Sequence, residues 1–111
     1  MILVLEDDGC VHVYPSIQDV VTQVEGLDAE DTLRGVFDDR GQRFAIRWPT
    51  PNRESRPFLG ISMVESGEYV LEPDGAPDAV ALLQVLRDAA MVLPADREPD
   101  VRSLERRLRG E

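Results

Sequence analysis

The chain has 111 residues, of which 42 % are hydrophobic and 31 % are charged, a composition typical of one soluble globular domain and not of a disordered chain. A formal net charge of −10 makes nucleic acid and anionic membranes unfavourable partners and a basic protein a favourable one. The single cysteine excludes an internal disulfide, and the apolar start MILVL is too short for a signal peptide or a membrane helix, so we expect a cytoplasmic protein.

The basic residues are concentrated in two segments. All twelve are arginine, which we interpret as the imprint of a GC-rich bacterial genome. Residues 1–33 contain eight acids and no arginine, whereas residues 34–57 contain six arginines and three acids. Residues 58–100 are again acidic, and residues 101–111 contain four arginines. The basic segments therefore offset an acidic surface, either within the monomer or across a self-association contact.

The first two predicted strands are residues 2–6 and 10–14, joined by a turn at Asp8-Gly9. The first strand is apolar on both faces, which predicts a position inside the sheet with a layer on each side. Alternation in the second strand places Val11 and Val13 toward the core. Three residues then share the opposite face: Cys10, His12 and Tyr14.

A helix is predicted to follow, with Ser16 as its N-cap, a valine-rich apolar stripe from Ile17 to Val24, and an end at Gly26. Residues 33–37 and 42–48 read as a second hairpin with Gly41 in its loop. Residues 49–57 contain three prolines and are expected to form an extended loop.

Residues 58–64 and 69–72 are predicted to form a third hairpin. Helices are expected from Asp78 to about Val92 and from Asp100 to Arg109. The whole chain, residues 1–111, is then a single α+β domain in which an antiparallel sheet of about six strands (three hairpins) packs with two to three helices, in the order ββα-ββ-ββ-αα. The pattern leaves open how firmly the C-terminal helix (99–111) is attached.

No combination of residues in the sequence specifies a reaction. Cys10 and His12 share a strand face, but their α-carbons should lie about 7 Å apart, and no further Cys or His can complete a zinc site. The acids in 6–8 and 38–39 are typical of turns, and the DDRGQRF stretch lacks the ligand spacing of a calcium loop. We therefore predict no catalytic residue, no metal and no cofactor.

Two groups of side chains are candidate binding residues. The first is acidic and would face a basic partner: Asp7, Asp8, Glu25, Asp28, Glu30, Asp31, Glu65 and Glu68. The second could form an anion site: Arg47, Trp48, Arg53 and Arg56. The alternative roles are solubility for the acids, neutralisation of neighbouring acids for the arginines, and a lid over the core for Trp48.

Eight cap, turn and core positions in the first 48 residues form a pattern: Ser16, Ile17, Gly26, Leu27, Asp28, Phe37, Asp38 and Gly41. In this pattern the segment resembles small bacterial proteins of immunity type that are encoded beside secreted toxins. The resemblance implies a cytoplasmic, acidic protein that binds one cognate toxin and carries no catalytic residues. The loop 49–57 and the C-terminal arginines lie outside it.

Three hypotheses follow for the function. The first is a non-enzymatic acidic protein-binding module, in the form of an immunity protein that neutralises a basic toxin by occlusion. The second is a small homodimeric regulatory or subunit-type protein that associates through an open sheet edge. The third is a small-ligand or enzyme module that uses the arginines around Trp48 as an anion pocket.

Overall fold

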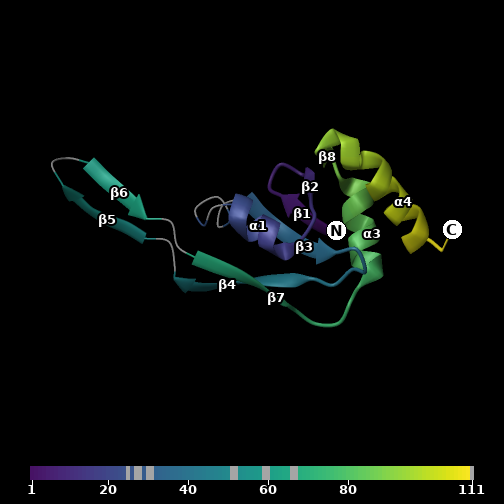
Figure 1. Cartoon of the computed structure of the whole chain (residues 1–111), viewed down its shortest axis with the longest axis horizontal. Helices are drawn as coiled ribbons and strands as arrows, with labels where there is room; N and C mark the ends of the chain where they lie inside the picture. Colours follow the sequence, from purple (N-terminus) through teal and green to yellow (C-terminus); the bar gives the residue numbers. More distant parts are fainter. Residues whose placement is uncertain are drawn as a thin grey trace.

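A four-stranded sheet with the order β3-β1-β2-β8 forms the centre of the computed structural model (Figure 1). β1 (Ile2–Glu6) pairs antiparallel with both β2 (Val11–Tyr14) and β3 (Leu33–Asp38). β8 (Val92–Leu93) pairs parallel with β2, so the sheet is mixed and the expectation of a purely antiparallel sheet is wrong. The predicted first hairpin and the internal position of its first strand are confirmed.

The structure describes residues 1–24, 26, 29, 32–50, 53–58, 61–65 and 68–110. Within these ranges, the side chains of 49–50, 53–58 and 61–65 are not described.

The turn between β1 and β2 contains three residues, Asp7, Asp8 and Gly9, because Glu6 N–H donates to the Cys10 carbonyl at 3.0 Å. Gly9 has a φ of 83°, in the left-handed region that favours glycine. The predicted turn is confirmed in position and is one residue longer than a two-residue loop.

α1 (Ile17–Gln23) begins at the predicted cap, since Asp19 N–H donates to Ser16 Oγ at 3.3 Å. The helix ends at Gln23, three residues before the predicted glycine. Val24 leaves the helical conformation, although its amide still donates to the Val20 carbonyl at 2.9 Å. Packing of this apolar stripe, with Val20 fully buried, stabilises a helix too short to persist alone.

The central sheet has a hydrophobic core on each face. On one face, Ile2 and Val4 of β1 pack with α1 and with two further strands, β4 (Phe44–Thr50) and β7 (Glu68–Pro73). On the other face, Leu3 of β1 and Val11 and Val13 of β2 pack with the C-terminal helices. The apolar run at the chain start therefore supplies both cores, as its two apolar faces predict.

The C-terminal part covers the second face with α3 (Ala79–Asp88) and α4 (Glu98–Leu108); η1 (Ala95–Arg97) leads into α4 and has no buried residue. α3 ends at Asp88, earlier than predicted, because the following residues pair with the β2 region. Ala90 N–H donates to the Gly9 carbonyl at 3.0 Å, and Val11 N–H donates to the Met91 carbonyl at 2.9 Å. Val101 and Leu104 of α4 are 0 % and 2 % exposed, so this helix is part of the core.

The middle of the chain forms a long two-stranded arm. β4 (Phe44–Thr50) pairs antiparallel with β7 (Glu68–Pro73), and β5 (Arg53–Phe58) pairs antiparallel with β6 (Ile61–Glu65). The β5–β6 hairpin lies beyond the end of β4 and β7 and stands away from the other elements (Figure 1). The arm contributes to dimensions of 61 × 28 × 20 Å.

Three predictions for this region are wrong. β3 pairs with β1 and meets the chain before β4 only at the Phe37–Arg43 bridge, so 33–37 and 42–48 are not a regular hairpin. The strands predicted for 58–64 and 69–72 do not pair with each other, because each has another partner. The expected loop 49–57 contains the end of β4 and most of β5.

Alternation in residues 42–48 predicts one inward and one outward face, and the structure confirms it: Phe44, Ile46 and Trp48 pack against the first core, and Arg43 and Arg47 are exposed. The chain is thus an α+β domain, with strands in a mixed central sheet and in the arm. Among the described residues, no helix has the length and apolar character needed to cross a membrane.

Candidate functional site

The predicted acidic group is described only in part. Asp7 and Asp8 are exposed in the β1–β2 turn, and Glu68 is exposed at the start of β7. The remaining members, or their side chains, lie outside the described residues: Glu25, Asp28, Glu30, Asp31 and Glu65.

Asp8 is held in place by its own turn. Its Oδ1 accepts a hydrogen bond from Cys10 N–H at 2.9 Å. This backbone hydrogen bond is the main reason that the pKa of Asp8 lies below its ordinary value. Asp8 is therefore a fixed negative charge at the tip of the first hairpin.

The predicted anion site is not assembled among the described side chains. Arg47 forms an ion pair with Glu72 across β4 and β7, which neutralises its charge. Trp48 packs on Tyr69, with ring centroids 5.4 Å apart, and contributes to the first core. The side chains of Arg53 and Arg56 are among those that the structure does not describe. An open hollow of about 470 Å³ adjoins Arg47 and Val70.

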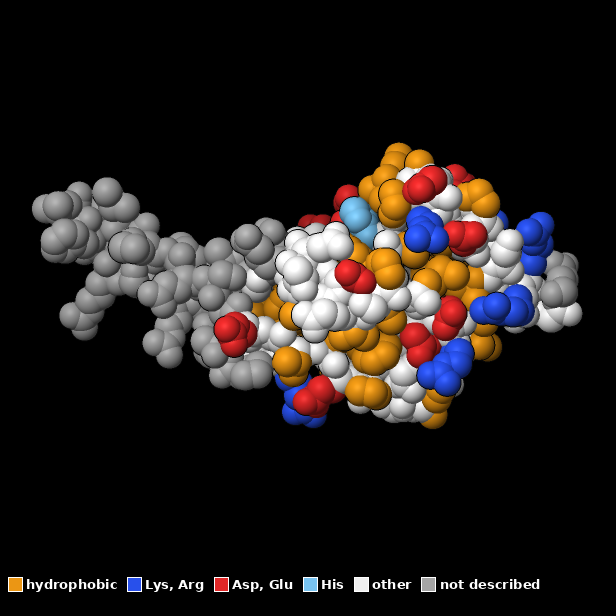
Figure 2. Space-filling model, in the orientation of Figure 1, with side chains coloured by type: hydrophobic (Ala, Val, Ile, Leu, Met, Phe, Trp, Pro, Cys, Tyr) orange, Lys and Arg blue, Asp and Glu red, His pale blue; other side chains and the backbone are white. Residues whose placement is uncertain are grey.

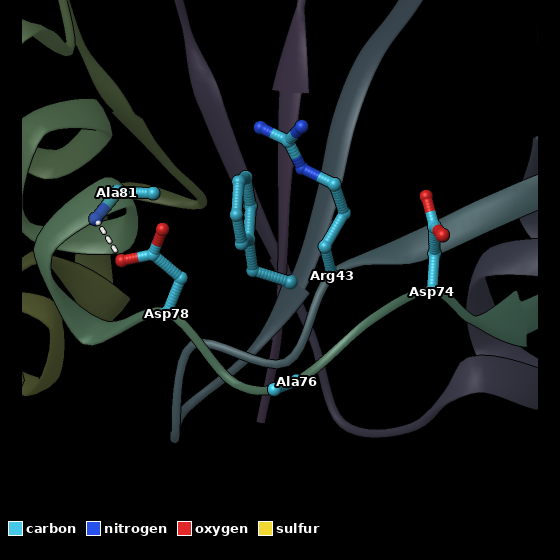
Figure 3. A pocket seen from close by; sticks show the side chains of 6 residues that line it. Arg43, Asp74, Ala76, Asp78 and Ala81 are labelled. Atoms are coloured by element: carbon cyan, nitrogen blue, oxygen red, sulfur yellow. Dashed lines mark hydrogen bonds between the residues drawn. The ribbon is translucent and has the colours of Figure 1, made fainter.

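A second hollow, of about 240 Å³, lies where the start of β4 meets the start of α3 (Figure 3). The Arg43 guanidinium lies 5.2 Å from the centre of the Phe37 ring, in a cation–π contact. Asp78 Oδ1 accepts a hydrogen bond from Ala81 N–H at 3.0 Å and so caps α3. Figure 3 shows Asp74 and Asp78 on opposite sides of Arg43. The helix cap accounts for Asp78 and the ring contact for Arg43, whereas Asp74 is held through its backbone, because its N–H donates to the Arg43 carbonyl at 2.9 Å.

Cys10 and His12 do not contact each other as a nucleophile and its base would. His12 Nε2 instead lies 3.0 Å from Glu6 Oε2, with 29 % and 15 % of the two side chains exposed. Burial, together with the hydrogen bond to Asp8, raises the pKa of the Cys10 thiol, which disfavours the reactive thiolate. The two residues thus have separate surroundings.

A row of polar side chains runs along the sheet face on which Ile2 and Val4 lie. Glu6 is opposite Cys10 in the hairpin, so His12 is its diagonal neighbour across the two strands. The His12 and Tyr14 rings are stacked, 6.4 Å apart and inclined by 20°. Beside them is a hollow of about 360 Å³, lined by His12, Val13, Tyr14, Pro15, Gln23, Leu93 and Pro94.

The electrostatics of this row are negative. Burial raises the pKa of Glu6; the charge of His12 opposes the shift, and those of Asp8 and Asp7 add to it. Burial and then the charge of Glu6 raise the pKa of Tyr14. Apart from burial, each cause of these two pKa shifts is the charge of an acid or of the His12 imidazole. Among the described residues, no arginine forms an ion pair with Glu6, Asp7 or Asp8.

Sequence reasoning did not find the Glu6–His12 pair. A three-residue turn at residues 7–9 predicts this pair, because it makes Glu6 and His12 diagonal neighbours on one face of an antiparallel hairpin, and long side chains can reach each other across that distance. The run of three acids instead favours a turn role for Glu6, together with Asp7 and Asp8.

No group of three or more His, Cys, Asp or Glu side chains in the described part of the chain is arranged to hold a metal ion. No protein-family model, no curated protein and no solved structure matches this chain.

Proposed function

We propose that this chain is a non-catalytic protein-binding module whose acidic surface covers a basic surface of a protein partner. One observation carries the proposal: many carboxylates have no ion-pair partner among the side chains that the structure describes. They are Asp7, Asp8, Asp19, Glu68, Asp74, Asp78, Asp88 and Asp96.

The arginines of η1 and α4 that form ion pairs are engaged with acids of the same segment and not with these eight. Arg97 pairs with Asp100, and Arg102 pairs with Glu98 and Glu105. Figure 2 shows arginines mostly at the end where α3 and α4 lie, whereas acidic side chains are spread over the visible face. A basic partner would therefore be steered toward the body of the domain by long-range attraction.

The partner that this proposal favours is a basic toxin, bound by a cognate immunity protein. Support comes from the excess of acids in residues 1–33 and from the resemblance of the first 48 residues to proteins of that type. Inhibition by occlusion needs complementary charge and shape, and it requires no reactive group in the inhibitor.

The test is co-expression of the tagged chain with the product of each neighbouring reading frame, followed by purification. We expect one basic product to co-purify at about 0.05 M salt and to be largely lost at about 0.5 M, because screening shortens the range of charge attraction. The Asp7→Asn/Asp8→Asn double variant should weaken the complex; the amide oxygen introduced at position 8 can still accept the turn hydrogen bond. The Glu98→Gln/Asp100→Asn double variant is the matched control, because these two exposed carboxylates already pair with Arg102 and Arg97. Absence of any such partner, or a complex indifferent to salt, would overturn the proposal.

A second candidate function is a homodimer formed through the arm. Its support is that β4 and β7 pair only with each other in the described sheets, which leaves strand edges open to another chain. Light scattering at low and high protein concentration tests it: a mass of twice 12.4 kDa favours the dimer, and 12.4 kDa throughout excludes it. The ion pair between Arg47 and Glu72 gives no support to the third hypothesis, an arginine-lined anion pocket.

A further inference from the structure

We propose that the hollow between β2, α1 and the Leu93–Pro94 segment receives the side chain of an arginine from the basic partner. This inference rests on the proposed function and names the anchoring contact of the complex. The hollow measures about 360 Å³, near the lower limit of pockets that bind small ligands, so it suits one side chain and not a large molecule.

The walls of the hollow match both parts of an arginine side chain. Leu93, Pro94 and Pro15 provide apolar surface for the aliphatic stem. The stacked rings of His12 and Tyr14 provide flat faces on which a planar guanidinium can stack. Figure 2 shows the only histidine of the chain at the surface, beside acidic and apolar side chains.

The charge at the hollow selects a cation. The Glu6 carboxylate is only 15 % exposed and lies 3.0 Å from His12 Nε2, and its charge also acts on Tyr14. Asp7 and Asp8 follow it in the chain and add further negative charge. Because His12 is charged only when protonated, no permanent positive charge offsets these acids among the described side chains. An arginine side chain of the partner would supply this positive charge.

Two polar groups at the hollow have no hydrogen-bond partner among the residues that the structure describes. The Tyr14 hydroxyl and the Gln23 side chain make no hydrogen bond to any described residue, although both line the hollow. Tyr14 oxygen and Gln23 carbonyl oxygen can both accept from N–H groups, and a guanidinium carries five such donors. The walls thus offer acceptors and aromatic faces to the cation, and the Glu6 carboxylate beside His12 adds negative charge next to the hollow.

The probe is arginine acetylated at its amino group and amidated at its carboxyl group, so that the guanidinium is its only charge. Titration into the ¹⁵N-labelled chain, followed by NMR, should shift the amides of His12, Tyr14, Gln23 and Leu93 in a saturable way. A ligand of this size should bind with a Kd on the order of 1 mM. The citrulline analogue, which has the same shape without the charge, should bind at least about tenfold more weakly.

Two variants locate the contact. Glu6→Gln keeps the shape of the side chain and removes its charge, and it should weaken binding about tenfold. Tyr14→Leu replaces the aromatic ring and its hydroxyl with an aliphatic side chain, and it should also weaken binding. Asp100→Asn, at an exposed acid that already pairs with Arg97, should bind as the parent does. The amide spectrum of each variant reports whether it is folded.

Equal shifts with the citrulline analogue, or unsaturable shifts at acids over the whole surface, would overturn the inference. The outcome separates it from the proposed function. If a co-purifying partner binds Glu6→Gln as tightly as the parent chain, the hollow is not the anchor and the proposed function stands. If the arginine probe binds in the hollow but no product of a neighbouring reading frame binds the chain, the proposed function is wrong and the arginine site stands.

Discussion

Tyr69→Phe tests how the arm is attached to the domain. Tyr69 is 4 % exposed, and its hydroxyl donates to the carbonyl of Val24 at 2.7 Å and lies 3.3 Å from that of Val20. These carbonyls lie in the last turn of α1 and just after it, where helix hydrogen bonds run out. One hydroxyl from β7 therefore supplies a donor to the end of a helix far away in the chain.

The expected loss of unfolding free energy is about 1–2 kcal/mol. The Val20 carbonyl still accepts the Val24 amide in the variant, so the cost falls mainly on the Val24 carbonyl, which loses a buried donor. Urea denaturation followed by circular dichroism measures the change, with an unaltered m-value as the sign that both states keep their compactness. Tyr14→Phe is the matched control, because that hydroxyl has no partner among the described residues; it should change stability by less than about 0.5 kcal/mol.

The same hydroxyl predicts a dependence on alkaline pH. Burial, followed by the influence of Tyr14, raises the pKa of Tyr69 from 10.0 to about 12 in the folded chain. Since the unfolded chain releases this proton first, the contribution is intact below pH 10 and is lost as pH rises toward 12, at up to about 1.4 kcal/mol per pH unit. Tyr69→Phe should remove this part of the slope. A variant as stable as the parent, with an unchanged alkaline slope, would refute the reasoning.

Three further changes have definite expected outcomes. Gly41→Ala should destabilise by about 2 kcal/mol or more in urea denaturation, because φ is 88° and a Cβ would lie 2.6 Å from the Asp78 carbonyl oxygen. In Asp38, burial raises the pKa, but hydrogen bonds from the Gln42 and Arg40 amides outweigh it and the net pKa is lowered. The resulting stability is present at neutral pH and is lost on acidification, so Asp38→Asn should make stability less sensitive to pH below about 4. The raised pKa of Glu6 has the opposite sign: its contribution is present in acid and is lost as pH rises through the folded-state pKa, so Glu6→Gln should be as stable as the parent or more stable at pH 7.

Local features of the sequence predicted the local structure well. The β1–β2 turn, the Ser16 cap, the glycine at 41 and the inward faces of β2 and β4 all depend on residues close together in the chain. Each of these features is determined by nearby residues. The determinants are a positive φ that requires glycine, a helix N-terminal amide that needs a side-chain acceptor, and the two-residue period with which apolar side chains alternate along a strand.

Strand partners could not be predicted in the same way, because pairing depends on residues far apart. Adjacency in the chain favours pairing of neighbouring strands, yet β3 joins β1 and β4 joins β7. The prolines at 49 and 57 suggested a loop, since proline cannot donate in a sheet interior. In a two-stranded arm, each strand has an open edge, and a residue whose N–H would face that edge loses nothing by being proline. Two prolines in residues 49–57 are therefore compatible with strands in this arm, although they favoured a loop.

The predicted geometry of the first hairpin gives the face on which the candidate site lies, but only the structure shows which other elements cover that face. Alternation placed His12 and Tyr14 on the face opposite Val11 and Val13, and that face is the one that carries the first core. α1 covers Ile2 and Val4 at the centre of the face, whereas toward β8 the cover ends at a hollow beside the two rings. Side chains at such a border are fixed by the core on one side and open to a partner on the other. An anchoring contact there would need little reordering on binding, which is the condition under which a single buried side chain contributes most to affinity.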